Sequence, residues 1–200
     1  MKKKAVFLDR DGTINRDVGY PNSSESIHIY PFSFEAVRLF NQAGFLTVVV
    51  TNQSGIARGL IGEDQLNRLH VRMKKDFERE KASIDIIYYC PHFCASLDPR
   101  YKKDCLCRKP SPALGQKAAD DFNIDLPGSY VIGDKSSDIL FGLNIGAIPI
   151  LVRTGYGRKT EETLSHGKNG PAFVADSILE AALWILDREK RHSARNVSNG

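Results

Sequence analysis

The sequence predicts an α/β protein whose core is a three-layer, doubly wound and mostly parallel sheet of five strands. Three observations support this class. Short apolar runs without alternation recur along the chain, which is typical of strands buried on both faces of a parallel sheet. Amphipathic segments with helical spacing separate these runs. Several runs end in polar residues and turns, and in open α/β sheets ligands bind just beyond the carboxyl ends of the strands.

The expected strands are short apolar runs bounded by turn residues. They cover residues 5–8, 45–50, 84–89, 129–132 and 147–152. The last run contains Pro149, which lacks the N–H that a strand donates to its neighbour. We therefore expect this strand to lie at the edge of the sheet.

The expected helices alternate with these strands. They cover residues 34–43, 63–81, 113–122, 139–144 and a final segment near the end of the chain. The final helix starts at Ser177, with Glu180 three residues on, which is the spacing of a capping box. Beyond Arg188 the chain is polar. We expect one domain over residues 1–190 and a flexible tail over 191–200.

Composition narrows the class of protein. Of the 200 residues, 42% are hydrophobic, which suits one globular core. The formal charge is only +4, without one long basic stripe, so we expect no nucleic-acid partner. A run of about 18 apolar residues, which a membrane span needs, does not occur. The lysines at 2–4 precede only a short apolar run, which does not fit a signal peptide. We expect a cytoplasmic monomer.

All four cysteines lie between residues 90 and 107, which indicates a metal site more than a set of disulfides. Cys90 and His92 form one close pair, and Cys105 and Cys107 form another. A Cys₃His set is a common structural zinc site. Cys94 competes with His92 as a ligand, and the alternative to zinc is a group of ordinary buried thiols. Zinc would fold this loop and fix the cations that directly follow it.

Polar side chains of different kinds follow three of the expected strands, and a pair of cations precedes a helix. The residues are Asp9 and Asp11, Thr51 and Asn52, Asp134 and Asp138, and Arg108 and Lys109. An isolated Asp-Gly pair would be read as a turn. The joint set instead matches transfer of a phosphoryl group to a carboxylate, the chemistry of aspartyl-phosphate enzymes.

Each residue type has a place in that chemistry. Asp9 would attack phosphorus, and Asp9 and Asp134 would hold Mg²⁺, which prefers carboxylates, water and substrate oxygens. Lys109 and the Thr51 hydroxyl would stabilise the phosphoryl oxygens. Asp11 is placed to protonate the leaving alkoxide and then to activate water.

The motifs FLDRDGT, VVVTNQ, CRKP and VIGDKSSD resemble, in this order, those of the haloacid dehalogenase-like phosphatase superfamily, which has a Rossmann-like fold. The resemblance covers about residues 5–152. It implies that Asp9 is the nucleophile and that Asp11 is the general acid and base, with its carbonyl on Mg²⁺. Thr51 and Lys109 would bind phosphate, and Asp134 would bind Mg²⁺. Asp138 would be a metal-site residue or simply an acid in the first turn of a helix.

Neither interval that carries a large cap domain in this superfamily is long enough for one here, so an open, capless site is expected. TNQSGIARG, the CPH and CLC pairs and VRTG most resemble the heptose 1,7-bisphosphate 7-phosphatases, with the histidinol-phosphate phosphatases as close relatives. The resemblance implies substrate recognition by Arg108 and a phosphate contact from Lys135. The site-lining residues that it implies are Asp17, Val18, Gly19, Tyr20, Asn52, Gln53 and Ser54.

The expected function is therefore Mg²⁺-dependent removal of the 7-phosphate of D-glycero-D-manno-heptose 1,7-bisphosphate, within synthesis of nucleotide-activated heptose for lipopolysaccharide or glycoprotein. Histidinol phosphate or another small monoester is the alternative substrate. A phosphotransferase is a further alternative, because the same aspartyl-phosphate can pass to an acceptor other than water. A zinc-bearing binding module on a degenerate hydrolase fold is the alternative from a different class.

Overall fold

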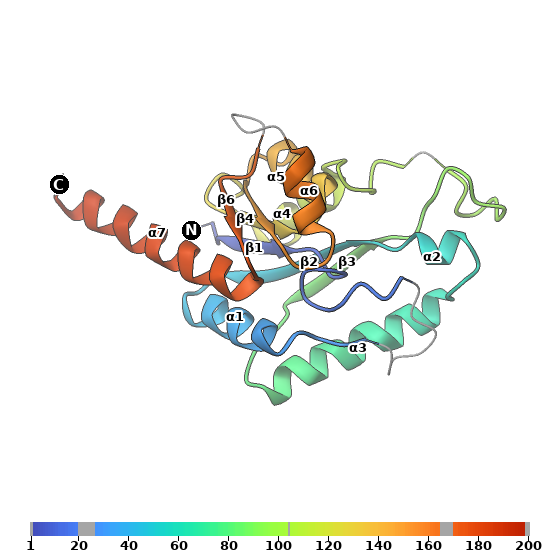
Figure 1. The fold of residues 1–200 in the computed structure, drawn as a ribbon, viewed down its shortest axis with the longest axis horizontal. Helices are drawn as coiled ribbons and strands as arrows, with labels where there is room; N and C mark the ends of the chain where they lie inside the picture. The colour runs from blue at the N-terminus through green and yellow to red at the C-terminus, as the bar shows by residue number, and fades with distance from the viewer. Residues whose placement is uncertain (1, 20–26, 104, 165–169, 199–200) are drawn as a thin grey trace.

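The computed structural model describes residues 2–19, 27–103, 105–164 and 170–198 (Figure 1). Its strands are β1 Ala5–Leu8, β2 Leu46–Asn52, β3 Ile86–Cys90, β4 Tyr130–Gly133, β5 Ile148–Val152 and β6 Phe173–Ala175. Within these described ranges they form one parallel sheet in the order β3-β2-β1-β4-β5-β6. The predicted class is confirmed, and β6 is an addition to the five expected strands.

The helices are α1 Pro31–Gln42, α2 Ser54–Ala57, α3 Glu63–Arg79, α4 Ala113–Phe122, α5 Ser136–Asn144, α6 Gly157–Thr163 and α7 Ile178–Ser198. The short helices α2 and α6 were not expected. Helix α7 continues well beyond Arg188, where we expected the helix to fray, and its far end projects from the body of the protein (Figure 1). None of the helices in the described part of the chain is both long and apolar enough to cross a membrane.

Alternate residues of each central strand are buried against opposite layers of helices. Val6 and Leu8 of β1 pack in one cluster with residues of α1, α3 and α7. Ala5 and Phe7 pack in a second cluster with residues of α4 and α5. Figure 1 shows these two layers on opposite sides of the sheet. Burial on both faces explains why the strands read as continuous apolar runs.

Pro149 does not mark an edge strand, because β5 pairs with both β4 and β6. The Pro149 carbonyl accepts a hydrogen bond of 2.8 Å from the Ala172 N–H, so the carbonyl of Pro149 faces the segment that leads into β6. Strand pairing there begins one residue later, at Ile150 opposite Phe173. The missing N–H of Pro149 therefore falls just before the ladder starts. Our edge prediction was wrong because β6, at Phe173–Ala175, is too short to be seen in the sequence.

The strand order reverses beside β1, and this reversal positions the site. The chain runs outward from β1 to β2 and β3, then crosses back to β4 on the other side of β1. Leu8, at the end of β1, is paired with Val49 and with Ile132. The residues that follow β1 and β4 therefore meet at one edge, which is where open α/β sheets bind their ligands.

Candidate active site

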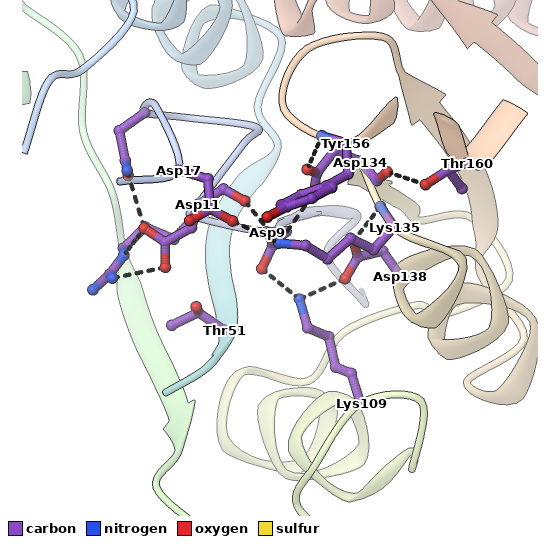
Figure 2. A network of polar contacts seen from close by, with 12 residues as sticks. Asp9, Asp11, Asp17, Thr51, Lys109, Asp134, Lys135, Asp138, Tyr156 and Thr160 are labelled. Atoms are coloured by element: carbon purple, nitrogen blue, oxygen red, sulfur yellow. Dashed lines mark hydrogen bonds and ion pairs between the residues drawn. The ribbon is translucent and has the colours of Figure 1, made fainter. Parts of the chain in front are cut away.

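Lys109 lies in a buried cluster of charges at the carboxyl edge of the sheet. Its Nζ donates a hydrogen bond of 2.7 Å to Asp9 Oδ1 and one of 2.6 Å to the Val50 carbonyl. The same nitrogen is 2.7 Å from Asp138 Oδ1. Figure 2 shows Lys109 reaching up between the two carboxylates. Three segments that are far apart in the sequence thus share one cation.

Burial and charge oppose each other in this cluster. Burial raises the pKa of Asp9 to about 6, although Lys109 acts in the opposite direction. Burial alone would lower the pKa of Lys109, but Asp138 and Asp9 together raise it above its ordinary value. The ammonium group therefore stays charged beside Asp9. An anionic phosphate brought to this site would meet a fixed positive charge that is only 4% exposed as a residue.

Asp134 contributes a buried carboxylate, one oxygen of which makes no hydrogen bond and lies 3.7 Å from Lys135 Nζ. Its Oδ2 accepts a hydrogen bond of 2.8 Å from the Tyr156 N–H, whereas its Oδ1 is buried without a hydrogen-bond partner. Burial, followed by the charge of Asp9, raises the pKa of Asp134 to about 7. Oxygens of Asp9, Asp134 and Asp138 all lie within 4.8 Å of one another. A buried oxygen without a hydrogen bond, among several carboxylates, is an environment that a divalent cation would stabilise, so these residues fit Mg²⁺.

Asp134 is held by a segment that our prediction assigned no role. The Thr160 hydroxyl donates a hydrogen bond of 2.8 Å to the Asp134 carbonyl, and Tyr156 binds the carboxylate through its backbone. Gly12, at φ +95°, and Gly155, at φ +57°, both pass so close that a Cβ on either would overlap the Asp134 carboxylate. In the sequence, this segment was marked by VRTG, which contributed to the family resemblance but was assigned no role.

Asp138 combines the two roles that the sequence left open. Its Oδ1 pairs with Lys109, and its Oδ2 accepts a hydrogen bond of 3.0 Å from the Lys135 N–H at the start of α5. The same carboxylate therefore caps a helix and belongs to the charged cluster. An acid in the first turn of a helix is favourable for the helix dipole in any case.

The Asp11 carboxylate is enclosed by N–H donors. Arg10 donates from Nε to Oδ1 over 3.0 Å and from Nη2 to Oδ2 over 2.7 Å. Asn15 Nδ2 donates to Oδ1 over 3.0 Å, and Gln53 Nε2 donates to Oδ2 over 2.9 Å. Burial alone would raise the pKa of Asp11, but Arg10, with help from Asn15 and Gln53, holds it below its ordinary value. In this arrangement Asp11 is an ionised and fully bonded carboxylate.

The other predicted site residues lie at the end of β2 and the start of α2, and two of them form hydrogen bonds with neighbouring residues. Thr51 Oγ1 accepts a hydrogen bond of 2.8 Å from Gln53 Nε2. Asn52 binds both polar backbone groups of Lys109, the N–H over 3.0 Å and the carbonyl over 3.2 Å. Ser54 begins helix α2. Asn52 thus fixes the segment that carries Lys109, a role that no pattern in the sequence indicated.

The loop after β1 is joined to the far side of the site by Lys135. Lys135 Nζ lies 3.1 Å from Asp17 Oδ2 and 3.4 Å from the Asp11 carbonyl (Figure 2). The Gly19 N–H donates to Asp17 Oδ1 over 2.9 Å, and Val18 is 42% exposed. These residues can face a bound substrate. Tyr20, which we predicted to line the site, lies outside the described residues.

The structure brings together the sulfur and nitrogen atoms of Cys90, His92, Cys105 and Cys107, all within 4.8 Å of one another. Distances between the three sulfurs are 3.0, 3.1 and 3.4 Å. His92 Nδ1 lies 3.2 Å from Cys107 Sγ. Cys94 is exposed and outside the metal-ligand clusters found among the described residues. The cluster has the donor set of a tetrahedral structural zinc site.

The loop that carries this cluster is fixed to the neighbouring helices and presents two arginines. The Tyr101 hydroxyl donates to Glu63 of α3 over 3.0 Å, and the Ser96 hydroxyl donates to a carbonyl of α2 over 2.5 Å. The guanidinium carbon of Arg58 lies 4.1 Å from the centre of the Phe93 ring, and that of Arg108 lies 6.0 Å from it. Phe93 therefore brings two cations to one part of the surface.

His70 of α3 is a buried residue that our prediction passed over. Its Nε2 lies 3.1 Å from Arg10 Nη1. Burial and the charge of Arg10 lower the pKa of His70 to about 3, against a smaller opposing effect of Asp11. The ring is therefore neutral in the folded protein at pH values where an exposed histidine would be charged.

This lowered pKa predicts a pH dependence of stability. The unfolded chain binds the His70 proton at a higher pH than the folded chain, so the free energy of unfolding contributed here is complete above pH 6.5 and is lost as the pH falls toward about 3. The limiting slope is about 1.4 kcal/mol per pH unit. Urea unfolding of wild type and His70→Gln is measured at several mildly acidic pH values. As the pH falls, the free energy of unfolding should decrease less in the variant than in wild type. Parallel pH dependences would contradict this assignment.

Comparison with known proteins agrees with the fold. A family model described as HAD-hydrolase-like matches residues 106–181. The D-glycero-beta-D-manno-heptose-1,7-bisphosphate 7-phosphatase of Vibrio cholerae is 39% identical over 95% of this chain and 100% of its own length. The corresponding protein of Escherichia coli K12 is 41% identical over 93% of this chain and 95% of its own length.

Solved structures give the same result. The D,D-heptose 1,7-bisphosphate phosphatase from B. bronchiseptica, complexed with magnesium and phosphate, superimposes with a TM-score of 0.82 at 32% identity, over 92% of this chain and 99% of that one. The fold and the cluster of charges are those of a HAD-like hydrolase. Within that class, the chain belongs to the family of the D-glycero-D-manno-heptose-1,7-bisphosphate 7-phosphatases.

Proposed function

We propose that this protein is a Mg²⁺-dependent phosphatase that removes the 7-phosphate of D-glycero-D-manno-heptose 1,7-bisphosphate. The observation that carries the proposal is the buried contact of 2.7 Å between Lys109 Nζ and Asp9 Oδ1, beside an oxygen of Asp134 that makes no hydrogen bond. This is a carboxylate nucleophile with a fixed cation beside it and a place for a metal. The names of the relatives identify the substrate.

Asp9 would attack phosphorus, and the bond from phosphorus to the sugar oxygen would break as the aspartyl-phosphate forms. Asp11, which is ionised in the free enzyme, would take up a proton when the substrate binds and would give that proton to the departing oxygen. In the second step Asp11 would take a proton from water, which attacks phosphorus and releases inorganic phosphate from Asp9. Lys109 and the Thr51 hydroxyl would bind phosphoryl oxygens in both steps, and Lys135 would contact the same group.

Asp9, Asp134 and the Asp11 carbonyl would hold Mg²⁺, with Asp138 close by. When bound, the metal would supply positive charge that offsets repulsion between the attacking carboxylate and the anionic phosphate. Cys90, His92, Cys105 and Cys107 would hold zinc. Zinc would be structural, because its donor set has no position left for a substrate once all four ligands bind.

The two arginines beside Phe93 favour a bisphosphate over histidinol phosphate. Arg58 and Arg108 flank Phe93 on the metal-binding loop, and guanidinium groups are well suited to a second phosphate. A non-catalytic binding module is less well supported, since Asp9, Lys109 and Asp138 form an intact buried network. We further propose that the enzyme works as a cytoplasmic monomer, with residues 1–190 as its single domain, in supply of heptose for lipopolysaccharide or glycoprotein.

A substrate panel tests this function. Purified enzyme with Mg²⁺ is assayed for phosphate release from both anomers of the heptose bisphosphate, other sugar phosphates and histidinol phosphate. We expect the highest kcat/KM for a heptose bisphosphate, and loss of turnover after chelation that added Mg²⁺ restores. A higher kcat/KM for histidinol phosphate would overturn the substrate assignment. Phosphate transfer to an added alcohol in place of water would indicate a phosphotransferase.

A further inference from the structure

Arg10 stands between the two aspartates of the first motif and is completely buried. Burying a guanidinium group is costly unless its N–H groups are paired. Each of the three guanidinium nitrogens of Arg10 has a partner. Nε and Nη2 donate hydrogen bonds to the two oxygens of Asp11, and Nη1 lies 3.1 Å from His70 Nε2. The proposed chemistry assigns no task to Arg10 or to His70.

The contact with Arg10 fixes the state of the His70 ring. Arginine can only donate hydrogen bonds, so His70 Nε2 must accept, and the ring must be neutral with its proton on Nδ1. His70 is 7% exposed and its ring lies 5.8 Å from that of Tyr89, measured between centres. The lowered pKa of His70 agrees with the neutral form. Helix α3 thus supplies a fixed acceptor to a guanidinium group in the β1 loop.

The donors around Asp11 differ in strength. The two bonds from Arg10 are charged and form a fork across both oxygens, whereas Asn15 and Gln53 each give one neutral amide N–H. Charge-assisted bonds are roughly twice as strong as neutral ones. The Gln53 amide also donates to Thr51 Oγ1, a proposed phosphate ligand. The amide bonds are therefore the ones that a leaving group can replace while the fork persists.

We propose that Arg10 and His70 are positioning residues for Asp11: the His70 ring fixes the guanidinium, and the guanidinium fixes the plane of the carboxyl group that exchanges a proton with the leaving oxygen and with water. This inference rests on the proposed function, because it assigns Asp11 the proton transfer. It adds Arg10, in the loop after β1, and His70, on α3, to the residues of the site.

The test separates proton transfer from binding and folding by means of the leaving group. The sugar oxygen needs a proton as it leaves, whereas the nitrophenolate of p-nitrophenyl phosphate departs as a stable anion. For each substrate kcat/KM reports the steps up to cleavage of the phosphorus–oxygen bond to the leaving group. In His70→Leu we expect kcat/KM for the best sugar phosphate of the panel to fall roughly 10-fold or more. This is the usual loss when a residue that orients a functional side chain is removed. For p-nitrophenyl phosphate it should stay close to the wild-type value.

His70→Gln and Met73→Leu are the matched controls. His70→Gln keeps a terminal oxygen that can accept from Arg10, and we expect it to recover most of the lost activity toward the sugar phosphate. Met73→Leu changes a buried residue of the same helix that contacts the core instead, and it should behave as wild type. If His70→Leu does not fold, Arg10→Lys keeps the charge without the fork and should show the same dependence on the leaving group.

Equal losses with both substrates, or no loss with the sugar phosphate, would overturn the positioning role. The proposed function is tested independently of the positioning role. If wild type prefers a different phosphomonoester, the heptose assignment is wrong, and the leaving-group comparison is made with that ester. If wild type cleaves no alkyl phosphate at all, both the function and the positioning role are wrong.

Discussion

Asp9→Asn is expected to abolish turnover while the protein still folds. The amide has nearly the shape of the carboxylate but cannot form the aspartyl-phosphate, and removal of a covalent nucleophile costs on the order of 10⁶-fold in well-studied hydrolases. Folding should be unaffected or improved. Burial raises the pKa of Asp9 to about 6, so that the charged form is disfavoured in the folded state, and Lys109 keeps its contact with Asp138. Phosphate release and thermal unfolding of the variant measure the two effects.

A suitable control for Asp9→Asn is Asp121→Asn, the same chemical change on an exposed position of α4. Asp121 pairs there with Lys117 and Tyr88, away from the cluster around Lys109. We expect wild-type turnover in this control. Measurable turnover in purified Asp9→Asn, above that of a mock purification, would rule out Asp9 as the nucleophile.

Cys107→Ser is expected to release zinc and to impair catalysis at a distance from the aspartates. Elemental analysis of wild type should give about one zinc per chain, as for a Cys₃His site. Cys107 immediately precedes Arg108 and Lys109, and Lys109 Nζ contacts Asp9. Release of the loop should therefore loosen both cations. We expect a higher KM and a kcat that is lower by roughly 10-fold or more, as measured by steady-state kinetics.

Cys94→Ser is the matched control for the zinc site. Cys94 lies in the same loop, but it is exposed and outside the Cys₃His cluster of the described residues. This variant should keep its zinc and its activity. If zinc leaves in Cys94→Ser and stays in Cys107→Ser, the ligand assignment is wrong, and the explanation of how zinc fixes Arg108 is wrong with it.

The meeting of Asp9 and Asp134 could be predicted because it depends on the sheet, whereas Lys109, which precedes α4, was assigned to the site by the resemblance of CRKP. Buried parallel strands are visible as apolar runs, and their carboxyl ends meet at one edge, so the residues that follow them must gather there. The contact between His70 and Arg10 could not be predicted in this way. It depends on the rotation of α3, and a histidine on the apolar stripe of a helix reads as an ordinary core residue.

The errors at β5 and β6 have a similar physical origin. A strand of three residues, Phe173–Ala175, is too short to show a period, and it is stabilised by pairing with β5 more than by its own sequence. Once β6 is missed, Pro149 suggests an edge. The cradle of Asp134 was missed because it is made of backbone: the Tyr156 N–H and the close approach of Gly12 and Gly155 have no side-chain signature.

The position of β1 at the centre of the sheet affects how the protein is made on the ribosome. Ala5–Leu8 is synthesised first and finds one partner at Leu46–Asn52, but its other edge stays open until Tyr130–Gly133 has emerged. Until then one edge of an apolar strand is open to other nascent chains, which is a known route to aggregation. A chain that terminates early would carry the nucleophile but could not assemble the site, and we expect such fragments to need chaperones.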